Sequence, residues 1–319
     1  MVDQAYLETC LRFYREHYAC CGRILKPGEK KFLGDKNSRI CRFCGKTCPQ
    51  VTFRKNAHAL PESVGNKSLF TYYECDSCNQ MFGDGIENDF GNWSKPFRTS
   101  NRIDGKGGVP TIKSADGGRL EGTPHSLDLK HKAGDAWFVH DEENQQLTLK
   151  LARDSYTPVA VLKAFVRMGL TVLPELEMPN FQTAIAWIQD KDHSKGHLVG
   201  SMMNQTTIEG NPPSGVIELM IFRRLRDEMD VPYASFFLGF GNETYQVFLP
   251  SPERDGHLHG REIDLVGFCG AFERSRRDAA VHREPLDLTG TSIIKNDVKS
   301  ITMRYVERTL ITPESTESE

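Results

Sequence analysis

The sequence contains no apolar run of about 18 residues, the length that a membrane-spanning helix requires. Its first 18 residues lack a basic start, and charges interrupt the stretch where a signal peptide would have its apolar core. No segment of the chain repeats another. These absences argue against helical membrane proteins and repeat arrays, and they predict a cytoplasmic protein without a membrane partner.

Cysteine is nearly missing beyond residue 79. Eight of the nine cysteines precede that position, and Cys269 is the ninth. An odd count that includes closely spaced pairs is typical of metal binding in a reducing compartment rather than of a disulfide framework. The cysteines therefore predict a metal site in the first quarter of the chain.

The net charge of −3 gives no sign of a nucleic-acid partner, but its distribution is uneven. The first 60 residues hold 12 Lys and Arg against 5 Asp and Glu, whereas residues 110–319 carry a net charge of −8. A basic N-terminal part is a modest electrostatic match for a phosphate backbone. A solvated basic surface explains the same excess equally well.

Two cysteine pairs, Cys41-Arg-Phe-Cys44 and Cys75-Asp-Ser-Cys78, are separated by 30 residues. Two residues between cysteines allow both sulfurs to bind one tetrahedral ion, and four thiolates complete a closed zinc site. Such a site leaves no position open for a substrate, so we predict structural Zn²⁺ that stabilises a small domain.

Three other cysteines offer alternative ligands. Cys48 follows Cys44 at a spacing that would let it compete for the ion, and Cys20 and Cys21 are adjacent thiols. We predict that these three are ordinary thiols, because only the two CxxC pairs form matching knuckles.

The segment around these pairs has a distinctive order of motifs. Residues 57–66 read AHALPESVGN, residues 69–74 form an apolar and aromatic run, and residues 75–87 read CDSCNQMFGDGIE. Together they resemble the HNH endonucleases, in particular the subgroup with the pattern CxxC…AHxxPESxGN…CxxCNxxFGxxIE. The resemblance covers about residues 38–93.

The resemblance implies a ββα-metal fold, with a first strand that ends at the histidine, a second at 69–74, and a helix that begins near Cys75. It implies that His58 deprotonates the attacking water and that Asn79 binds a catalytic Mg²⁺ or Mn²⁺ ion through its amide oxygen. That ion contacts the scissile phosphate and stabilises the leaving 3′-oxygen. The chemistry is consistent, because histidine titrates near neutral pH and hard oxygen ligands suit these cations.

The sequence departs from the family pattern at two positions. Many relatives have a metal-binding residue directly before the base, where this chain has Ala57. We predict that Glu87 supplies the missing ligand, with Asp84 as the second choice. The middle asparagine of the pattern, which braces the loop, is replaced by Phe70; Asn66 is the nearest substitute and is alternatively a turn residue.

We predict an α+β chain in which a small zinc-stapled ββα-metal domain, residues 1–105, precedes a larger mixed domain, residues 106–308. An amphipathic helix is expected at 3–18, a polar loop at 26–38, a linker or long loop at 94–109, and a disordered acidic tail at 309–319. Further helices are expected at 158–173 and 181–189. Further strands are expected at 109–113, 136–140, 146–151, 216–222, 235–240, 245–249, 263–268 and 301–306.

The larger domain shows no catalytic signature. Its basic cluster at 223–226 fits either phosphate contacts or, more simply, solvated surface. By analogy with bacterial defence effectors of similar architecture, this domain would recognise an activating ligand or protein partner, or form a homo-oligomer. We therefore weigh three hypotheses: an endonuclease acting on DNA, with RNA left open; an inactive zinc-stapled binding module; and a nuclease gated by its C-terminal domain.

Overall fold

The computed structural model describes residues 4–114, 117–130, 137–198, 202–210, 215–263, 266–276 and 278–307. The predicted acidic tail lies outside these ranges. None of the helices in the described residues has the length and apolar character needed to cross a membrane.

The largest element is a six-stranded antiparallel sheet. Its strands follow in the spatial order β1 (Tyr18–Leu25), β11 (Ile217–Arg224), β12 (Ala234–Phe240), β13 (Glu243–Leu249), β10 (Met203–Ile208) and β14 (Val281–Pro285). Every residue of β12 and β13 is buried. Such continuous burial requires cover on both faces of the sheet.

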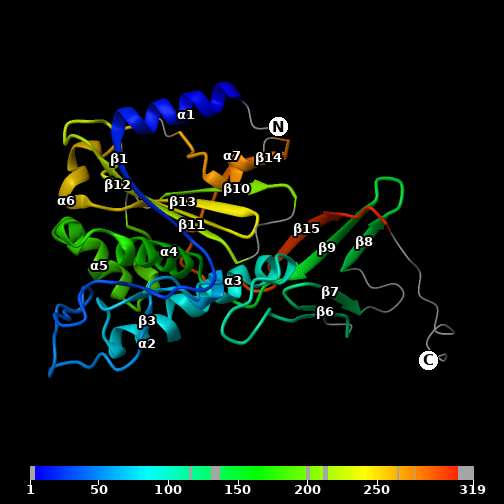
Figure 1. The fold of residues 1–319 in the computed structure, drawn as a ribbon, viewed down its shortest axis with the longest axis horizontal. Coiled ribbons are helices and arrows are strands. Elements are labelled where there is room, and N and C mark those ends of the chain that lie inside the picture. The colour runs from blue at the N-terminus through cyan, green and yellow to red at the C-terminus, as the bar shows by residue number, and fades with distance from the viewer. Residues whose placement is uncertain are drawn as a thin grey trace.

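Helices supply that cover from two sides (Figure 1). On one face lies α1 (Gln4–His17), whose Cys10 and Tyr14 are buried against the sheet. On the other lies α4 (Pro158–Val172), which packs on β12 and β13 and is buried along almost its whole length. The same side holds α2 (Asp76–Asp84), α3 (Ile86–Ser100) and α5 (Gln182–Gln189). Short helices complete the list: η1 (Glu62–Val64), η2 (Glu175–Phe181), η3 (His193–Lys195), α6 (Pro252–Asp255), η4 (Gly256–Leu258) and α7 (Ala271–Ser275).

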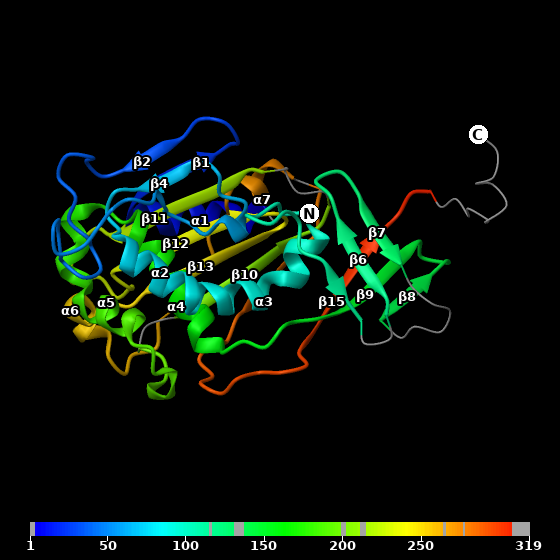
Figure 2. The same ribbon diagram turned by 90° about the horizontal axis from the view of Figure 1, so that it is seen from below.

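Two small sheets lie beyond the end of α3 (Figure 2). One contains β5 (Ile112–Lys113), β6 (Arg119–Gly122) and β7 (Leu127–Lys130), and the other β15 (Val298–Arg304), β9 (Gln146–Ala152) and β8 (Phe138–Asp141). Apolar side chains from both sheets share one cluster, centred on Leu120, Trp137 and Leu149. This lobe has its own core, separate from that of the large sheet.

The remaining sheet belongs to the region of the cysteine pairs. It has the order β2 (Lys31–Leu33), β4 (Leu69–Thr71) and β3 (Ala57–His58), and α2 follows it. The strand β3 is antiparallel to β4 and ends at His58. The predicted succession of strand, strand and helix is thus confirmed, although β4 is shorter than the predicted 69–74.

Three predicted segments are wrong. The polar loop expected at 26–38 contains β2, because Lys31–Leu33 pairs with β4. The linker expected at 94–109 is helical as far as Ser100, because buried Trp93 and Phe97 anchor a helix that contains Pro96. The strand expected at 263–268 is not found in its described residues. There the backbone hydrogen-bonds to side chains instead of to another strand. The hydroxyls of Tyr6 and Tyr14 in α1 donate to the carbonyls of Gly267 and Val266, and the side-chain oxygen of Gln246 accepts from the amide of Phe268.

The predicted first domain, residues 1–105, is not an isolated body. Its α1 and β1 belong to the large sheet, and β1 pairs with β11 along eight residues. One hydrophobic core contains Cys41 and Cys75 together with α4 and the large sheet. Because this core includes residues of both predicted domains, the boundary at residue 105 stays a prediction.

Within the basic cluster at 223–226, Arg224 is not on the free surface. Arg224 is buried, its guanidinium bonds to the carboxylate of Asp255, and it also donates to the backbone carbonyls of Val231 and Arg254. A guanidinium used in this way is not available to a phosphate, so both sequence-based interpretations of Arg224 are wrong.

Candidate active site

The four cysteines of the CxxC pairs converge on one point. Within the described ranges, the Sγ atoms of Cys41, Cys44, Cys75 and Cys78 all lie within 4.8 Å of one another. The Sγ atoms of Cys44 and Cys75 are 3.8 Å apart. A tetrahedral zinc ion with Zn–S bonds of about 2.3 Å separates its sulfurs by about 3.8 Å, so the cluster fits a structural zinc.

Local backbone geometry explains why the pairs can meet. The first knuckle closes because Gly45 adopts a left-handed conformation (φ +69°) and its amide donates to the Cys41 carbonyl. The second begins at Cys75, which precedes the first residue of α2. Asp76 accepts hydrogen bonds from the amides of Arg54 and Lys55, which fastens the intervening loop to this knuckle.

The alternative thiols lie elsewhere. Cys48 is exposed, and Cys20 and Cys21 are exposed on β1. None of the three belongs to the four-sulfur cluster found among the described residues, and their role as ordinary thiols stays a prediction.

The sequence after His58 folds into a turn that returns toward its ring. Residues Glu62–Val64 form a single 3-10 turn that begins after Pro61 and ends at Gly65, whose φ of +83° favours glycine. This turn places Glu62 Oε1 3.0 Å from Nε2 of His58. Glu62 had no role in the sequence interpretation, although its position four residues after the histidine was a usable signal.

The ring of His58 is half-buried between the strand and this turn. Its Nδ1 is buried, whereas Nε2 faces Glu62. Burial lowers the pKa of His58 below its ordinary value, and the carboxylate of Glu62 and the backbone of Asn66 oppose that shift. The ring is therefore neutral at neutral pH, the protonation state that a general base requires.

A cavity of about 410 Å³ opens beside this pair. Glu62 and Glu87 both line it, together with Pro61, Ser63, Gly83, Asn88, Gly91, Asn92, Lys95, Arg98, Pro110 and Asp154. The loop after β3 and the helix α3 thus contribute one carboxylate each to the same space. Carboxylate oxygens are the hard ligands that Mg²⁺ and Mn²⁺ take in proteins.

The predicted metal ligands occupy different places around this cavity. Asn79 is half-buried on α2 and is not among the described lining residues, but Gly83, one turn later on the same helix face, is. Asp84 lines another cavity, of about 240 Å³, with Asp190 and His193. Of the two carboxylates considered for the missing ligand, Glu87 is therefore the one that shares a cavity with Glu62.

Residues 41–94 match the family model described as HNH endonuclease. These residues form an HNH domain. No curated protein and no solved structure matches the chain. The match covers the four-cysteine cluster, His58, Asn79 and Glu87, and it indicates a nuclease or nucleic-acid-binding role; the larger part of the chain lies outside it.

A buried arginine joins the HNH domain to α4. The guanidinium of Arg167 bonds to the carboxylate of Glu74, and its Nη1 lies 3.0 Å from Glu87 Oε1. Burial raises the pKa of Glu74 to about 7, against the opposing charge of Arg167. Sequence reasoning missed Arg167; its signal was a cation four residues after Lys163 in an otherwise apolar helix.

Asn66 braces the loop between β3 and β4. Its amide nitrogen donates to the carbonyls of Leu60 and Leu69, and its oxygen accepts from the amides of Ser68 and Leu69. The side chain is fully buried, so each of these bonds is shielded from water. Of the two sequence-based interpretations, the brace matches this geometry better than a simple turn residue.

Replacing Asn66 with alanine should lower the free energy of unfolding by about 3 kcal/mol, because buried backbone groups lose their partners. Urea denaturation of Asn66→Ala and of the exposed control Asn37→Ala measures the difference. A loss below about 1 kcal/mol in Asn66→Ala would mean that the loop does not depend on this brace.

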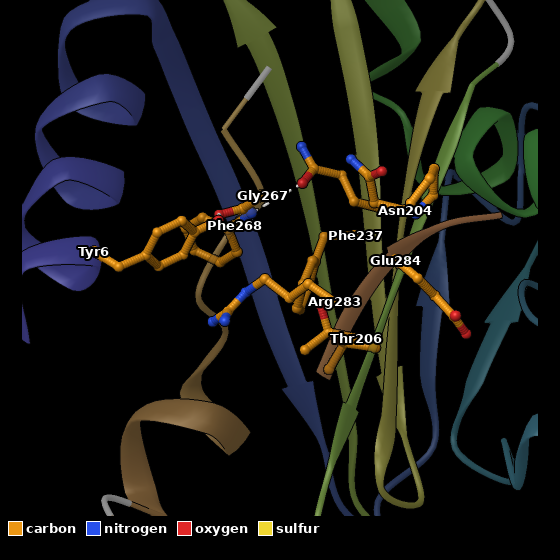
Figure 3. Close-up of a pocket in the computed structure, with 11 residues that line it drawn as sticks. Tyr6, Asn204, Thr206, Phe237, Gly267, Phe268, Arg283 and Glu284 are labelled. Carbon is orange, nitrogen blue, oxygen red and sulfur yellow. Dashed lines mark hydrogen bonds between the residues drawn. The ribbon is translucent and has the colours of Figure 1, made fainter. Parts of the chain in front are cut away.

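A further cavity, of about 150 Å³, lies in the larger domain beside α1 (Figure 3). The guanidinium of Arg283 lies 4.4 Å from the ring centroid of Tyr6 and pairs with the carboxylate of Glu273. The polar side chains Asn204 and Thr206 of β10 also line it. Because α1 and α4 cover opposite faces of the large sheet, this cavity is separate from the HNH site.

Proposed function

We propose that this protein is a metal-dependent endonuclease that hydrolyses phosphodiester bonds in DNA. The observation that carries the proposal is the pairing of His58 with Glu62, which lines one cavity together with Glu87, inside an HNH domain with a four-cysteine cluster. A base and a hard-ligand carboxylate beside one space are what hydrolysis of a phosphodiester needs.

His58 acts as the general base. With its pKa lowered by burial, the ring is neutral and takes a proton from the attacking water, while its Nε2 faces the carboxylate of Glu62, which lines the cavity. Glu62 then stabilises the imidazolium that this transfer creates, as a neighbouring carboxylate does for other catalytic histidines. Asn66 keeps the loop that carries both groups in place.

Asn79 and Glu87 would hold the divalent ion. Their donor set fits Mg²⁺ or Mn²⁺, since each supplies an oxygen, and Glu87 lines the cavity. When bound, this ion supplies positive charge that stabilises the phosphate and the leaving oxygen. Arg98 and Lys95 line the same cavity and add positive charge for a phosphate, although Lys95 is 2.7 Å from Asp154.

The second candidate is a zinc-stapled module that binds nucleic acid or protein without cutting. Two observations favour it: Ala57 offers no ligand, and Arg167 already neutralises Glu87. The nuclease proposal is the stronger of the two, because Glu87 remains 21% exposed and carries a second carboxylate oxygen. A nuclease gated by its larger domain differs from the first candidate only in its need for an activator.

A cleavage assay separates these candidates. Purified protein is incubated with supercoiled plasmid in Mg²⁺, in Mn²⁺, or without added divalent ion. The proposal expects nicked or linear DNA only when divalent ion is added. A protein that binds DNA but leaves both the plasmid and a single-stranded circular DNA intact in both metals supports the binding module, and cutting that appears only with cell extract supports gating.

A further inference from the structure

One face of the HNH sheet carries a row of rings that the catalytic proposal does not use. In the sheet register, Phe32 of β2 lies opposite Phe70 of β4, and Phe70 lies opposite His58 of β3. Paired residues on neighbouring strands point to the same face, so the three side chains cross the sheet as one row. Tyr72, two residues after Phe70, projects from that face as well.

The rings of this row are stacked on one another. The centroids of Phe32 and Tyr72 are 4.8 Å apart with 12° between their planes, and those of Phe32 and Phe70 are 5.3 Å apart at 24°. The ring of His58 lies 4.5 Å from that of Phe70. The aromatic row, meaning Phe32, Phe70 and Tyr72, therefore leads from the sheet edge to the catalytic base.

A cation lies over the ring at each end of the aromatic row. The Nζ of Lys30 is 5.5 Å from the centroid of Phe70, and the guanidinium of Arg39 is 4.8 Å from that of Tyr72. Arg39 is fixed there, because its Nη1 donates to the carbonyl of Phe53. Rings flanked by cations can bind both parts of a nucleotide: the rings stack on its flat base, and the cations attract its phosphate.

Within the aromatic row, Phe32 and Tyr72 are partly exposed, whereas Phe70 is buried at 6% exposure. Phe32 is 36% exposed, and neither Phe32 nor Phe70 belongs to the hydrophobic clusters of the described residues. The neighbouring residue Leu69 points the other way and is fully buried in the core.

We propose that the accessible rings of the aromatic row, Phe32 and Tyr72, form a stacking platform for unpaired bases and that the substrate of the HNH site is single-stranded DNA. This inference rests on the proposed nuclease function and names the substrate class of the same site. Bases within a duplex are stacked on each other and hidden from protein rings, whereas unpaired bases stack readily on aromatic side chains. The charges fit as well, because Lys30 and Arg39 meet the phosphates that join those bases.

The distance between Phe32 and His58 suits a DNA strand that runs from the stacking platform to the general base. Phe32 and His58 are separated by two strand spacings, which is about 10 Å. This distance corresponds to roughly three nucleotides at the ~3.4 Å rise of stacked DNA. A base stacked on Phe32 thus places the scissile phosphate within a few nucleotides, beside the 410 Å³ cavity.

Binding in the absence of added divalent ion tests the proposal without cleavage. Fluorescence anisotropy compares a labelled 20-nucleotide strand with its duplex, using the wild type, Phe32→Ala, Phe32→Trp and the distant exposed control Val139→Ala. We expect the single strand to bind at least about tenfold more tightly than the duplex, and Phe32→Ala to weaken single-strand binding by about tenfold. Phe32→Trp and Val139→Ala should match the wild type.

Equal affinity for strand and duplex, or single-strand binding by Phe32→Ala within twofold of wild type, would overturn the proposal. Zinc content and the urea midpoint show whether Phe32→Ala is folded. If Phe32→Ala is not folded, the test uses wild-type protein and a DNA strand that contains 2-aminopurine. Stacking of this base on an aromatic ring quenches its fluorescence, so an unquenched signal on binding contradicts the platform.

The two proposals fail in different ways. Quenched, single-strand-selective binding by a protein that never cuts DNA would contradict the nuclease and leave the platform standing. Metal-dependent cutting of duplexes that Phe32→Ala does not alter would contradict the platform alone.

Discussion

Replacing His58 with alanine should lower the rate of metal-dependent DNA cleavage by two to four orders of magnitude, the usual contribution of a positioned general base. The reason is local: the neutral ring of His58 is the proposed base, and its Nε2 lies 3.0 Å from Glu62, which lines the cavity. Single-turnover cleavage of a labelled substrate by wild type and His58→Ala measures the ratio directly.

A matched control is His125→Ala, which removes an exposed histidine far from the HNH domain in sequence. It should cut at the wild-type rate, and both variants should keep one zinc per chain. Cleavage by His58→Ala within threefold of wild type would remove His58 from the mechanism, whatever the control shows.

The pH dependence of the cleavage rate should also reflect the role of His58 as the general base. Burial lowers the pKa of His58, so the ring stays neutral down to a pH below about 6.5 and then gains a proton. The protonated ring cannot accept a proton from water. Cleavage should therefore be constant through neutral pH and fall on acidification below that value, and a fall that begins above pH 7 would contradict the assignment.

Replacing Cys78 with serine should unfold the HNH domain. Structural zinc contributes about 10–16 kcal/mol of binding free energy in small domains, which equals or exceeds the total stability of about 5–15 kcal/mol of a typical protein. The four cysteines also belong to, or pack against, the core that reaches α4, so the loss should spread beyond the knuckles. Metal analysis and thermal unfolding of Cys78→Ser measure both effects.

Cys48→Ser is the matched control, because Cys48 is an exposed thiol outside the cluster. It should retain one zinc per chain and unfold at the wild-type temperature. Loss of zinc from Cys48→Ser but not from Cys78→Ser would reverse the ligand assignment.

The parts of the site that sequence could predict are those held by local spacing. Two residues within each CxxC pair and the turn at Gly65 fix geometry over a few residues, so the zinc cluster and the ββα order were within reach of the sequence. The residues that contact these groups from distant parts of the chain could not be predicted. Arg167, 93 residues after Glu74 in the chain, meets Glu74 and Glu87 only because α4 packs on the HNH domain.

The fold shows the same division. The helix α4 and the strands β12 and β13 have strong apolar patterns, and the sequence predicts them. In contrast, β1 reads YACCGRIL, whose exposed polar and glycine residues hide a strand that pairing with β11 stabilises. The end of α3 was missed because Pro96 argues against a helix, while tertiary burial of its neighbours overrides that preference.

The central claim is that one divalent ion binds beside His58 in a domain that zinc holds together. Anomalous diffraction from crystals soaked in Mn²⁺ tests it in one experiment, with data collected at the zinc and manganese absorption edges. The account predicts a zinc peak among the four Sγ atoms and a manganese peak in the cavity lined by Glu62 and Glu87. A zinc peak without manganese in that cavity, from crystals whose soaked protein cuts DNA in solution, would contradict it.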